Sequence, residues 1–190
     1  MALILASGSP IRRQMLDAAG VAFEVILPGI DEAAMKADGS DAAAVALALA
    51  QAKALAVEAD SWVIGSDSVV SVEGRRFDKP ADRGQAAEHL RYFSGKVMTL
   101  TSAVALSRGG TIHWSIADEA RLHVRTLSEG FIADYLDQEW PDVGYCVGVF
   151  RMEGRGIQLF EKIDGSHFTI LGMPLLSLLA ALRERGLVAT

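Results

Sequence analysis

A short polar segment near the N-terminus, Ser7-Gly-Ser-Pro-Ile-Arg-Arg13, combines residue types that bind phosphate. It holds the hydroxyls of Ser7 and Ser9 and the guanidinium groups of Arg12 and Arg13. Ser9 suits the N-cap of a helix, and Pro10 suits the first helical position, where a missing N–H costs nothing. The free N–H groups and the positive dipole end of such a helix favour an anion. The segment lacks the Gly-Lys-Ser/Thr ending of a Walker A loop, so it predicts an anion site without specifying a reaction.

Asp67 is the strongest candidate for a catalytic group. It comes directly after an apolar stretch, Trp62-Val-Ile-Gly65, which we expect to be a strand, and α/β proteins commonly present active groups just past strand ends. A carboxylate there can bind Mg²⁺ or act as a general base. Glu32, in a predicted loop, offers a second carboxylate, so the two can share the divalent cation that triphosphate hydrolysis usually requires. The alternatives are a turn-capping aspartate and two solvated loop carboxylates.

Two lysines stand out by their sequence context. Lys53 follows Val45 and Leu49 at helical spacing, so it shares a stripe with large apolar residues. Its ammonium must either extend to water or meet an anion. Lys79 precedes Pro80, which holds its predecessor extended. A solvated loop lysine is the alternative for Lys79.

Composition narrows the class of protein. The chain has 190 residues, of which 51% are hydrophobic and 22% charged, which predicts one domain covering residues 1–190. Its net charge of −6 argues against nucleic-acid binding, and no apolar stretch approaches the length of a membrane span. We expect no signal peptide. A single cysteine, Cys146, excludes an internal disulfide and fits the cytoplasm. The four histidines show no metal-ligand spacing.

The alternation of strand and helix patterns predicts an α/β protein with a mixed sheet. We expect strands at 3–6, 21–27, 62–65, 69–72, 97–106, 112–124 and 157–163, and helices at 10–19, 41–59, 82–93, 126–136 and 174–185. Asp41 and Asp82 are expected to cap their helices, with either Thr126 or Ser128 capping the fourth. Gly109-Gly110 is expected to turn a long hairpin.

Taken together, these segments resemble the Maf family of nucleoside triphosphate pyrophosphatases over nearly the whole chain. The resemblance implies a cytoplasmic enzyme with a Maf/ITPase-like fold and central cleft, often a homodimer. Such an enzyme cleaves a nucleoside triphosphate to the monophosphate and pyrophosphate with Mg²⁺ or Mn²⁺. The matching motifs are Ala6-Ser-Gly-Ser-Pro-Ile-Arg-Arg13, Ile30-Asp-Glu32, Ala50-Gln-Ala-Lys-Ala54, Ile64-Gly-Ser-Asp-Ser-Val-Val70, Lys79-Pro80, Leu90–Lys96, Glu153-Gly154, Ile163-Asp-Gly165 and Leu171-Gly-Met-Pro-Leu175.

The resemblance also implies roles for individual residues. Asp67 matches the family's proposed proton acceptor, and Glu32, Lys53 and Lys79 match its other charged residues. Asp67 and Glu32 are the expected metal ligands. The expected phosphate-binding residues are Ser7, Ser9, Arg12 and Arg13. Electrostatic stabilisation of the phosphoryl oxygens is then the main catalytic effect.

Three positions depart from the family branches that act on dTTP and UTP, namely Ile11, Ser68 and Glu153. The sequence around Glu153 is more similar to the branch acting on 7-methyl-GTP, although that branch tends to have Trp and Gln in place of Ile11 and Ser68. The Glu153 carboxylate can accept hydrogen bonds from the N1–H and N2 amino groups of a guanine, which uracil lacks. We therefore treat these three as specificity residues.

Three functions are consistent with these observations. The first is a pyrophosphatase that removes non-standard nucleotides, such as 7-methyl-GTP, before polymerases use them. The second is a nucleotide-binding regulator of cell division or septum formation without significant catalysis. The third, a kinase or nucleotidyltransferase, is disfavoured because the phosphate-loop motifs of those enzymes are absent.

Overall fold

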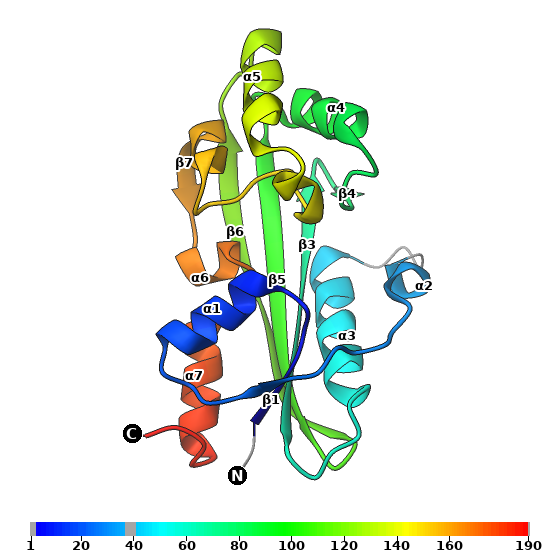
Figure 1. The fold of residues 1–190 in the computed structure, drawn as a ribbon, viewed down its shortest axis with the longest axis vertical. Coiled ribbons are helices and arrows are strands. Elements are labelled where there is room, and N and C mark those ends of the chain that lie inside the picture. The colour runs from blue at the N-terminus through cyan, green and yellow to red at the C-terminus, as the bar shows by residue number, and fades with distance from the viewer. Residues whose placement is uncertain (1–2, 37–40, 190) are drawn as a thin grey trace. The chain divides into compact units, whose positions relative to one another are not determined.

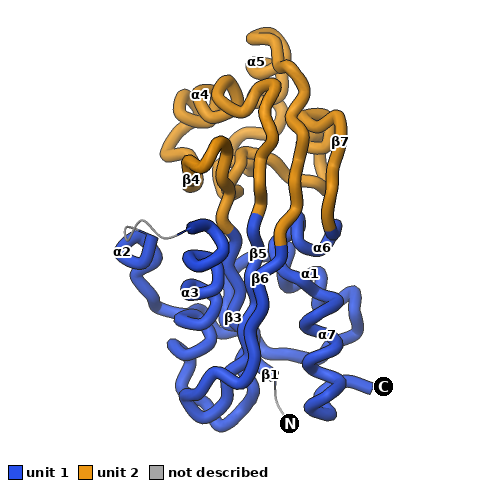
Figure 2. The backbone as a smooth tube through the Cα atoms, turned by 180° about the vertical axis from the view of Figure 1, so that it is seen from behind, with its two compact units in different colours: residues 1–68, 101–118, 166–190 blue, residues 69–100, 119–165 orange. Residues whose placement is uncertain are grey.

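The computed structural model describes residues 3–36 and 41–189, and these residues form two compact units (Figure 2). The first unit comprises Met1–Ser68, Thr101–Asp118 and Ser166–Thr190, and the second comprises Val69–Leu100 and Glu119–Gly165. Three strands, β3 (Trp62–Val72), β5 (Val97–Arg108) and β6 (Thr111–Val124), contribute residues to both units. The single domain expected over residues 1–190 stays a prediction.

The strands form one seven-stranded mixed sheet in the order β2-β1-β3-β5-β6-β7, with β4 pairing with β3. Strand β1 (Leu3–Ala6) runs parallel to both β2 (Glu24–Val25) and β3, and its Ala6 pairs with Gly65. Strand β4 (Arg75–Phe77) is antiparallel to β3, and β7 (Phe160–Asp164) is antiparallel to β6. The mixed α/β architecture predicted from the sequence is confirmed.

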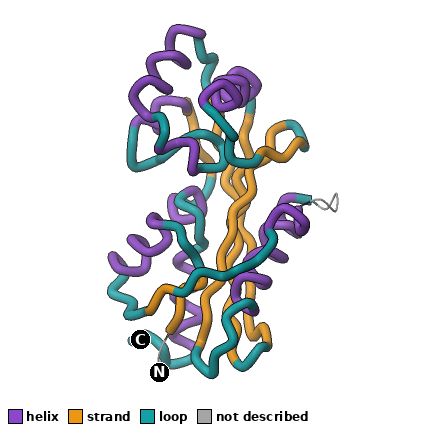
Figure 3. Tube along the Cα trace, turned by 45° about the vertical axis from the view of Figure 1, so that its right-hand side comes forward, coloured by secondary structure: helices purple, strands orange, loops and turns teal. Residues whose placement is uncertain are grey.

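In the first unit, helices cover both faces of the strands (Figures 1 and 3). Helices α1 (Pro10–Ala18) and α7 (Leu175–Glu184) lie on one face, and α3 (Ala42–Leu55) lies on the other. The remaining helices of this unit are the short α2 (Glu32–Lys36) and α6 (His167–Ile170).

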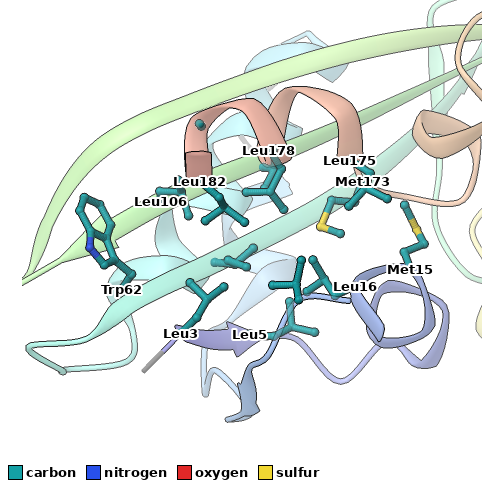
Figure 4. Close-up of a cluster of buried hydrophobic side chains, with 14 residues drawn as sticks. Leu3, Leu5, Met15, Leu16, Trp62, Leu106, Met173, Leu175, Leu178 and Leu182 are labelled. Atoms are coloured by element: carbon teal, nitrogen blue, oxygen red, sulfur yellow. The ribbon is translucent and has the colours of Figure 1, made fainter. Parts of the chain in front are cut away.

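The core of the first unit shows why β1 is apolar throughout. Leu3 and Leu5 pack with Leu16 of α1 and Leu178 of α7 (Figure 4), whereas Ile4 and Ala6 pack with Val63 on the opposite face. Successive strand residues point to opposite faces, so a strand covered on both sides is buried at every position.

The second unit contains helices α4 (Arg83–Phe93) and α5 (Glu129–Glu139), followed by two 3-10 turns, Asp142–Tyr145 and Arg155–Leu159. Arg91 on α4 donates two hydrogen bonds to Glu129 on α5, each at 2.8 Å, which ties the two helices together. Asp82 caps α4, as the sequence predicts, and of the two candidates for α5, Thr126 and Ser128, it is Ser128 that caps the helix.

Several predicted boundaries are wrong. Strand β3 does not end at Gly65 but continues to Val72, because the polar side chains of Ser66 and Asp67 find buried partners within the fold. Asp67 therefore lies inside a strand and not past its end. Glu32 begins helix α2 and is not in a loop. Other differences are the shortening of the predicted strand 21–27 to Glu24–Val25, the end of α3 at Leu55 and the 3-10 turn over Arg155–Leu159.

Among the helices of residues 3–36 and 41–189, none is long and apolar enough to cross a membrane.

Candidate active site

The segment between β1 and α1 has the predicted form. Ser9 occupies the N-cap position of α1 with extended backbone, and Pro10 follows at the start of the helix. The Ser9 side chain makes no capping hydrogen bond; instead its backbone N–H donates to Ser7 Oγ at 3.2 Å. The Ser9 side chain therefore does not cap the first turn of α1, where free N–H groups can bind an anion.

Arg12 is buried, with 8% of its surface exposed, whereas Arg13 is exposed on α1. The guanidinium of Arg12 donates three hydrogen bonds. Its Nε donates to the Gly172 carbonyl at 2.9 Å, its Nη1 to Ser7 Oγ at 3.3 Å and its Nη2 to Ser68 Oγ at 3.0 Å. Burial lowers the pKa of Arg12, and the charges of Asp67 and Glu32 oppose that shift. All three hydrogen-bond acceptors are neutral, so none of them compensates the buried charge of Arg12, which an anion could neutralise.

Gly172 is a further candidate site position, which the residue types alone do not indicate. Its carbonyl accepts hydrogen bonds from Arg12 Nε, Ser66 Oγ at 3.1 Å and Ser68 Oγ at 3.2 Å. Its φ of +109° favours glycine, and a Cβ there would lie 3.3 Å from Ser68 Oγ. The signal in the sequence is the Leu171-Gly-Met-Pro-Leu175 motif, which carries the resemblance but indicates no chemistry by itself.

Lys53 joins the two predicted carboxylates. Its ammonium lies 2.6 Å from Asp67 Oδ1 and 2.8 Å from Glu32 Oε1, and the side chains of Lys53 and Asp67 are each only 8% exposed. Glu32 is more open, at 43% exposure, and Lys36 also lies 4.0 Å from it. Of the two alternatives for Lys53, extension to water is thus excluded, because its ammonium contacts anions.

Gly65 determines how closely helix α3 approaches strand β3. A Cβ at Gly65 would lie 2.1 Å from the Ala50 carbonyl oxygen and 2.5 Å from the Ala54 nitrogen, both on α3. Positions 65 and 67 face the same side of β3, so the same close approach of α3 brings Lys53 to Asp67.

Ile11 is half-buried and packs against the hydrophobic core of the first unit. Ser68, also half-buried, accepts a hydrogen bond from Arg12 Nη2 and forms another with Ser102 Oγ, 2.8 Å away. Two of the three expected specificity residues therefore make contacts within the first unit.

Lys79 and Glu153 belong to the second unit, both with exposed side chains. Lys79 follows β4 in the predicted loop, and Glu153 lies in the turn before Arg155–Leu159. Both lie near Cys146: burial raises the pKa of that thiol, Glu153 raises it further, and Arg151 and Lys79 lower it. Arg151 is a charged residue of this group that the motifs do not single out. It donates hydrogen bonds to Glu139 at 3.2 Å and to Asp142 at 2.8 Å.

Comparison with known proteins agrees with these motifs. The model of the Maf-like protein family matches residues 2–185. The chain belongs to the Maf-like family. The resemblance stated from the motifs is thereby confirmed.

This Maf-like protein has close relatives of similar length. It is 47% identical to the 7-methyl-GTP pyrophosphatase of Rhizobium meliloti, over 98% of this chain and 97% of the relative. It is 42% identical to the nucleoside triphosphate pyrophosphatase of Sphingopyxis alaskensis, over 98% of each chain. The structure of the Staphylococcus aureus Ham1 protein aligns with a TM-score of 0.49 at 16% identity, over 98% of this chain and all of the other.

The residues of the Maf-like protein fit a divalent cation at Asp67. The Oδ2 atom of Asp67 is buried and has no hydrogen-bond partner among the described residues, while Oδ1 binds Lys53. The part of the chain that the structure describes contains no group of three or more His, Cys, Asp or Glu side chains that could hold a metal alone. Mg²⁺ is usually bound by one or two carboxylates together with substrate phosphates and waters, which suits Asp67 and Glu32.

Proposed function

We propose that this Maf-like protein hydrolyses a nucleoside triphosphate to the monophosphate and pyrophosphate. The observation that carries the proposal is the Lys53 ammonium between Asp67 and Glu32, in the same unit as the buried cation Arg12. Relatives more than 40% identical over nearly the full chain are named as pyrophosphatases, which supports the same reaction.

The charges of the site support a metal-dependent reaction. Arg12 and Lys53 supply two positive charges, and Asp67 and Glu32 supply two negative charges, so the four groups sum to zero. A triphosphate adds several negative charges that these groups do not neutralise. We therefore propose that Asp67 and Glu32 hold Mg²⁺ or Mn²⁺, which neutralises phosphate charge and makes bound water more acidic.

The chain's own residues have the following proposed roles. Asp67 accepts the proton of the water whose oxygen forms the new bond to the α-phosphorus, as the bond from that phosphorus to the pyrophosphate oxygen breaks. Lys53 fixes the Asp67 carboxylate in place. Phosphate oxygens are bound by Ser7, Ser9, Arg12, Arg13 and the start of α1, which stabilise the charge that develops on them. Lys79, in the second unit, is a further proposed phosphate ligand.

We propose a modified guanine nucleotide, 7-methyl-GTP, as the substrate. The Glu153 carboxylate would accept hydrogen bonds from the N1–H and N2 amino groups of guanine. Ile11 is also proposed to contribute to selection of the nucleotide base. The Rhizobium relatives named as 7-methyl-GTP pyrophosphatases support this choice. The biological role would be to keep such nucleotides out of nucleic acids.

The test is a panel of canonical and modified nucleoside triphosphates with Mg²⁺ or Mn²⁺, resolving pyrophosphate from orthophosphate. We expect pyrophosphate, a preference for 7-methyl-GTP over UTP that falls in Glu153→Gln, and a loss of about two orders of magnitude in turnover for Asp67→Asn. Orthophosphate as the product would contradict the bond assignment. Nucleotide binding without turnover would instead support a non-catalytic regulator. Cytoplasmic location and homodimer formation stay predictions, which cell fractionation and size-exclusion chromatography test.

A further inference from the structure

Ser68 lies on the face of β3 that is turned toward α1. Side chains alternate along a strand, so Ser66 and Ser68 point to one face while Gly65 and Asp67 point to the other. The contacts agree with this alternation, because Ser68 binds Arg12 of α1 and Asp67 binds Lys53 of α3. Ser68 therefore belongs to the surroundings of Arg12, although it is the immediate neighbour of the proposed proton acceptor.

The hydrogen bonds of Ser68 form a chain with one direction. Arg12 Nη2 donates to Ser68 Oγ at 3.0 Å, and Ser102 Oγ donates to the Thr169 carbonyl at 2.8 Å. A hydroxyl has a single proton. With the Ser102 proton given to Thr169, the 2.8 Å bond between the two serines uses the proton of Ser68, which also has the Gly172 carbonyl as an acceptor at 3.2 Å. The chain then runs from Arg12 through Ser68 and Ser102 to Thr169, an arrangement in which successive hydrogen bonds strengthen one another.

This chain holds the guanidinium in one orientation. Three nitrogens of Arg12 each donate one hydrogen bond to the protein, to Gly172, Ser7 and Ser68. A guanidinium has five N–H groups, so one remains on each Nη atom for an anion. A donor fixed before the ligand arrives binds it without a cost of reorganisation.

We propose that Ser68 is a positioning residue that acts on the triphosphate through Arg12 and does not read the base. Its only proton has acceptors within the protein, Ser102 Oγ at 2.8 Å and the Gly172 carbonyl at 3.2 Å, so it has none to donate to a nucleobase. Its oxygen accepts from the guanidinium that would bind phosphate. The inference rests on the proposed function, because it assigns Arg12 to the triphosphate.

The test compares Ser68→Ala with Ser68→Thr and Ser66→Ala. Calorimetry with inorganic pyrophosphate measures affinity for phosphate without a base, and steady-state kinetics measures 7-methyl-GTP against UTP. We expect Ser68→Ala to weaken pyrophosphate binding and to raise KM for both nucleotides by the same factor, about five- to tenfold. The ratio of the two kcat/KM values should not change, and Ser68→Thr, which keeps the hydroxyl, should restore affinity.

Ser66→Ala is the matched control. Its hydroxyl lies on the same strand face and contacts Ala103 O at 2.8 Å and Gly172 O at 3.1 Å, but forms no bond with Arg12. We expect its pyrophosphate affinity to stay within about twofold of wild type, well below the effect of losing a hydrogen bond to a charged group. Equal losses in Ser66→Ala and Ser68→Ala would mean general loosening of the fold and would overturn the proposal. Should Ser68→Ala fail to fold, Ser68→Cys carries the same expectation, because a thiol is a weak acceptor.

A double-mutant cycle separates this inference from the proposed function. In an Arg12→Met background, Ser68→Ala should have no further effect on pyrophosphate affinity, because its partner is gone. An unchanged effect in that background would refute the inference, as would a tenfold change in base preference with normal pyrophosphate affinity. A wild-type protein that releases no pyrophosphate from any nucleotide would refute the proposed function, whereas the calorimetric cycle would still decide the role of Ser68.

Discussion

The substitution Gly65→Ala tests whether the approach of α3 to β3 sets the geometry of the active site. The new Cβ would lie 2.1 Å from the Ala50 carbonyl oxygen, and a carbon and an oxygen normally approach to about 3.3 Å. The contacting atoms are backbone, so no side-chain rotation relieves the clash. Helix α3 must therefore retreat from β3 by about 1 Å.

The retreat moves Lys53 away from Asp67. Their ion pair now spans 2.6 Å, and a displacement of this size at a catalytic group can cost about 10²-fold in rate. We expect kcat for 7-methyl-GTP to fall by about that factor, with a smaller change in KM because Arg12 and Ser7 lie on other elements. Forcing a methyl group into a packed interface should also cost about 1–3 kcal/mol of unfolding free energy.

Gly29→Ala is the matched control, because a Cβ there would meet nothing within 4 Å. Urea denaturation gives the unfolding free energy of each variant, and kinetics are measured at temperatures where all variants are folded. A Gly65→Ala protein with the kcat and stability of the Gly29→Ala control would refute the reasoning, since the helix would then tolerate the extra carbon without moving Lys53.

Two further predictions concern the contribution of charged side chains to stability, and the first is about ion pairs. Lys53→Met should cost about 3–5 kcal/mol of unfolding free energy, because it leaves the buried Asp67 carboxylate without its partner. Lys162→Met, which removes an exposed partner of Asp164, should cost under about 1 kcal/mol in the same urea titration. The second prediction concerns pH. Hydrogen bonds from Lys96 and Tyr92 lower the pKa of Glu73 below its ordinary 4.5. Their stabilisation is present above that value and is lost as the pH falls through the lowered pKa. Wild type should therefore lose its stability advantage over Glu73→Gln as the pH falls below 4.5 and through the lowered pKa, and an advantage that does not decline with falling pH would contradict this assignment.

Features that depend on near neighbours in the chain could be predicted from the sequence. The helix starts at Asp41 and Asp82 were correct, because each carboxylate accepts from an N–H three residues ahead. The turn at Gly109-Gly110 was also correct, because both residues adopt positive φ. The place of Lys53 on an apolar helical stripe marks it as unusual from the sequence alone. These predictions depend only on the geometry of residues that are close together in the sequence.

Predictions failed where distant partners stabilise a local conformation. From the sequence, Ser66 and Asp67 are typical of the end of a strand, since polar residues commonly follow a buried one. Strand β3 continues because Ser66 donates to Ala103 and Asp67 binds Lys53, and neither partner is adjacent in sequence. The starting position of α2 at Glu32 was missed, although Asp31 accepts from the Ala34 N–H at 3.2 Å.

The sequence by itself determined which residues carry charge and hydroxyl groups, and it identified the segment from Ser7 to Arg13 as a place for phosphate. Only the tertiary structure decided what those groups contact. Arg12 is held by Gly172, 160 positions away, and Lys53 reaches Asp67 because Gly65 has no side chain. Hydrogen bonds and close packing act over a few ångströms in space, so the chain must fold before these residues become neighbours.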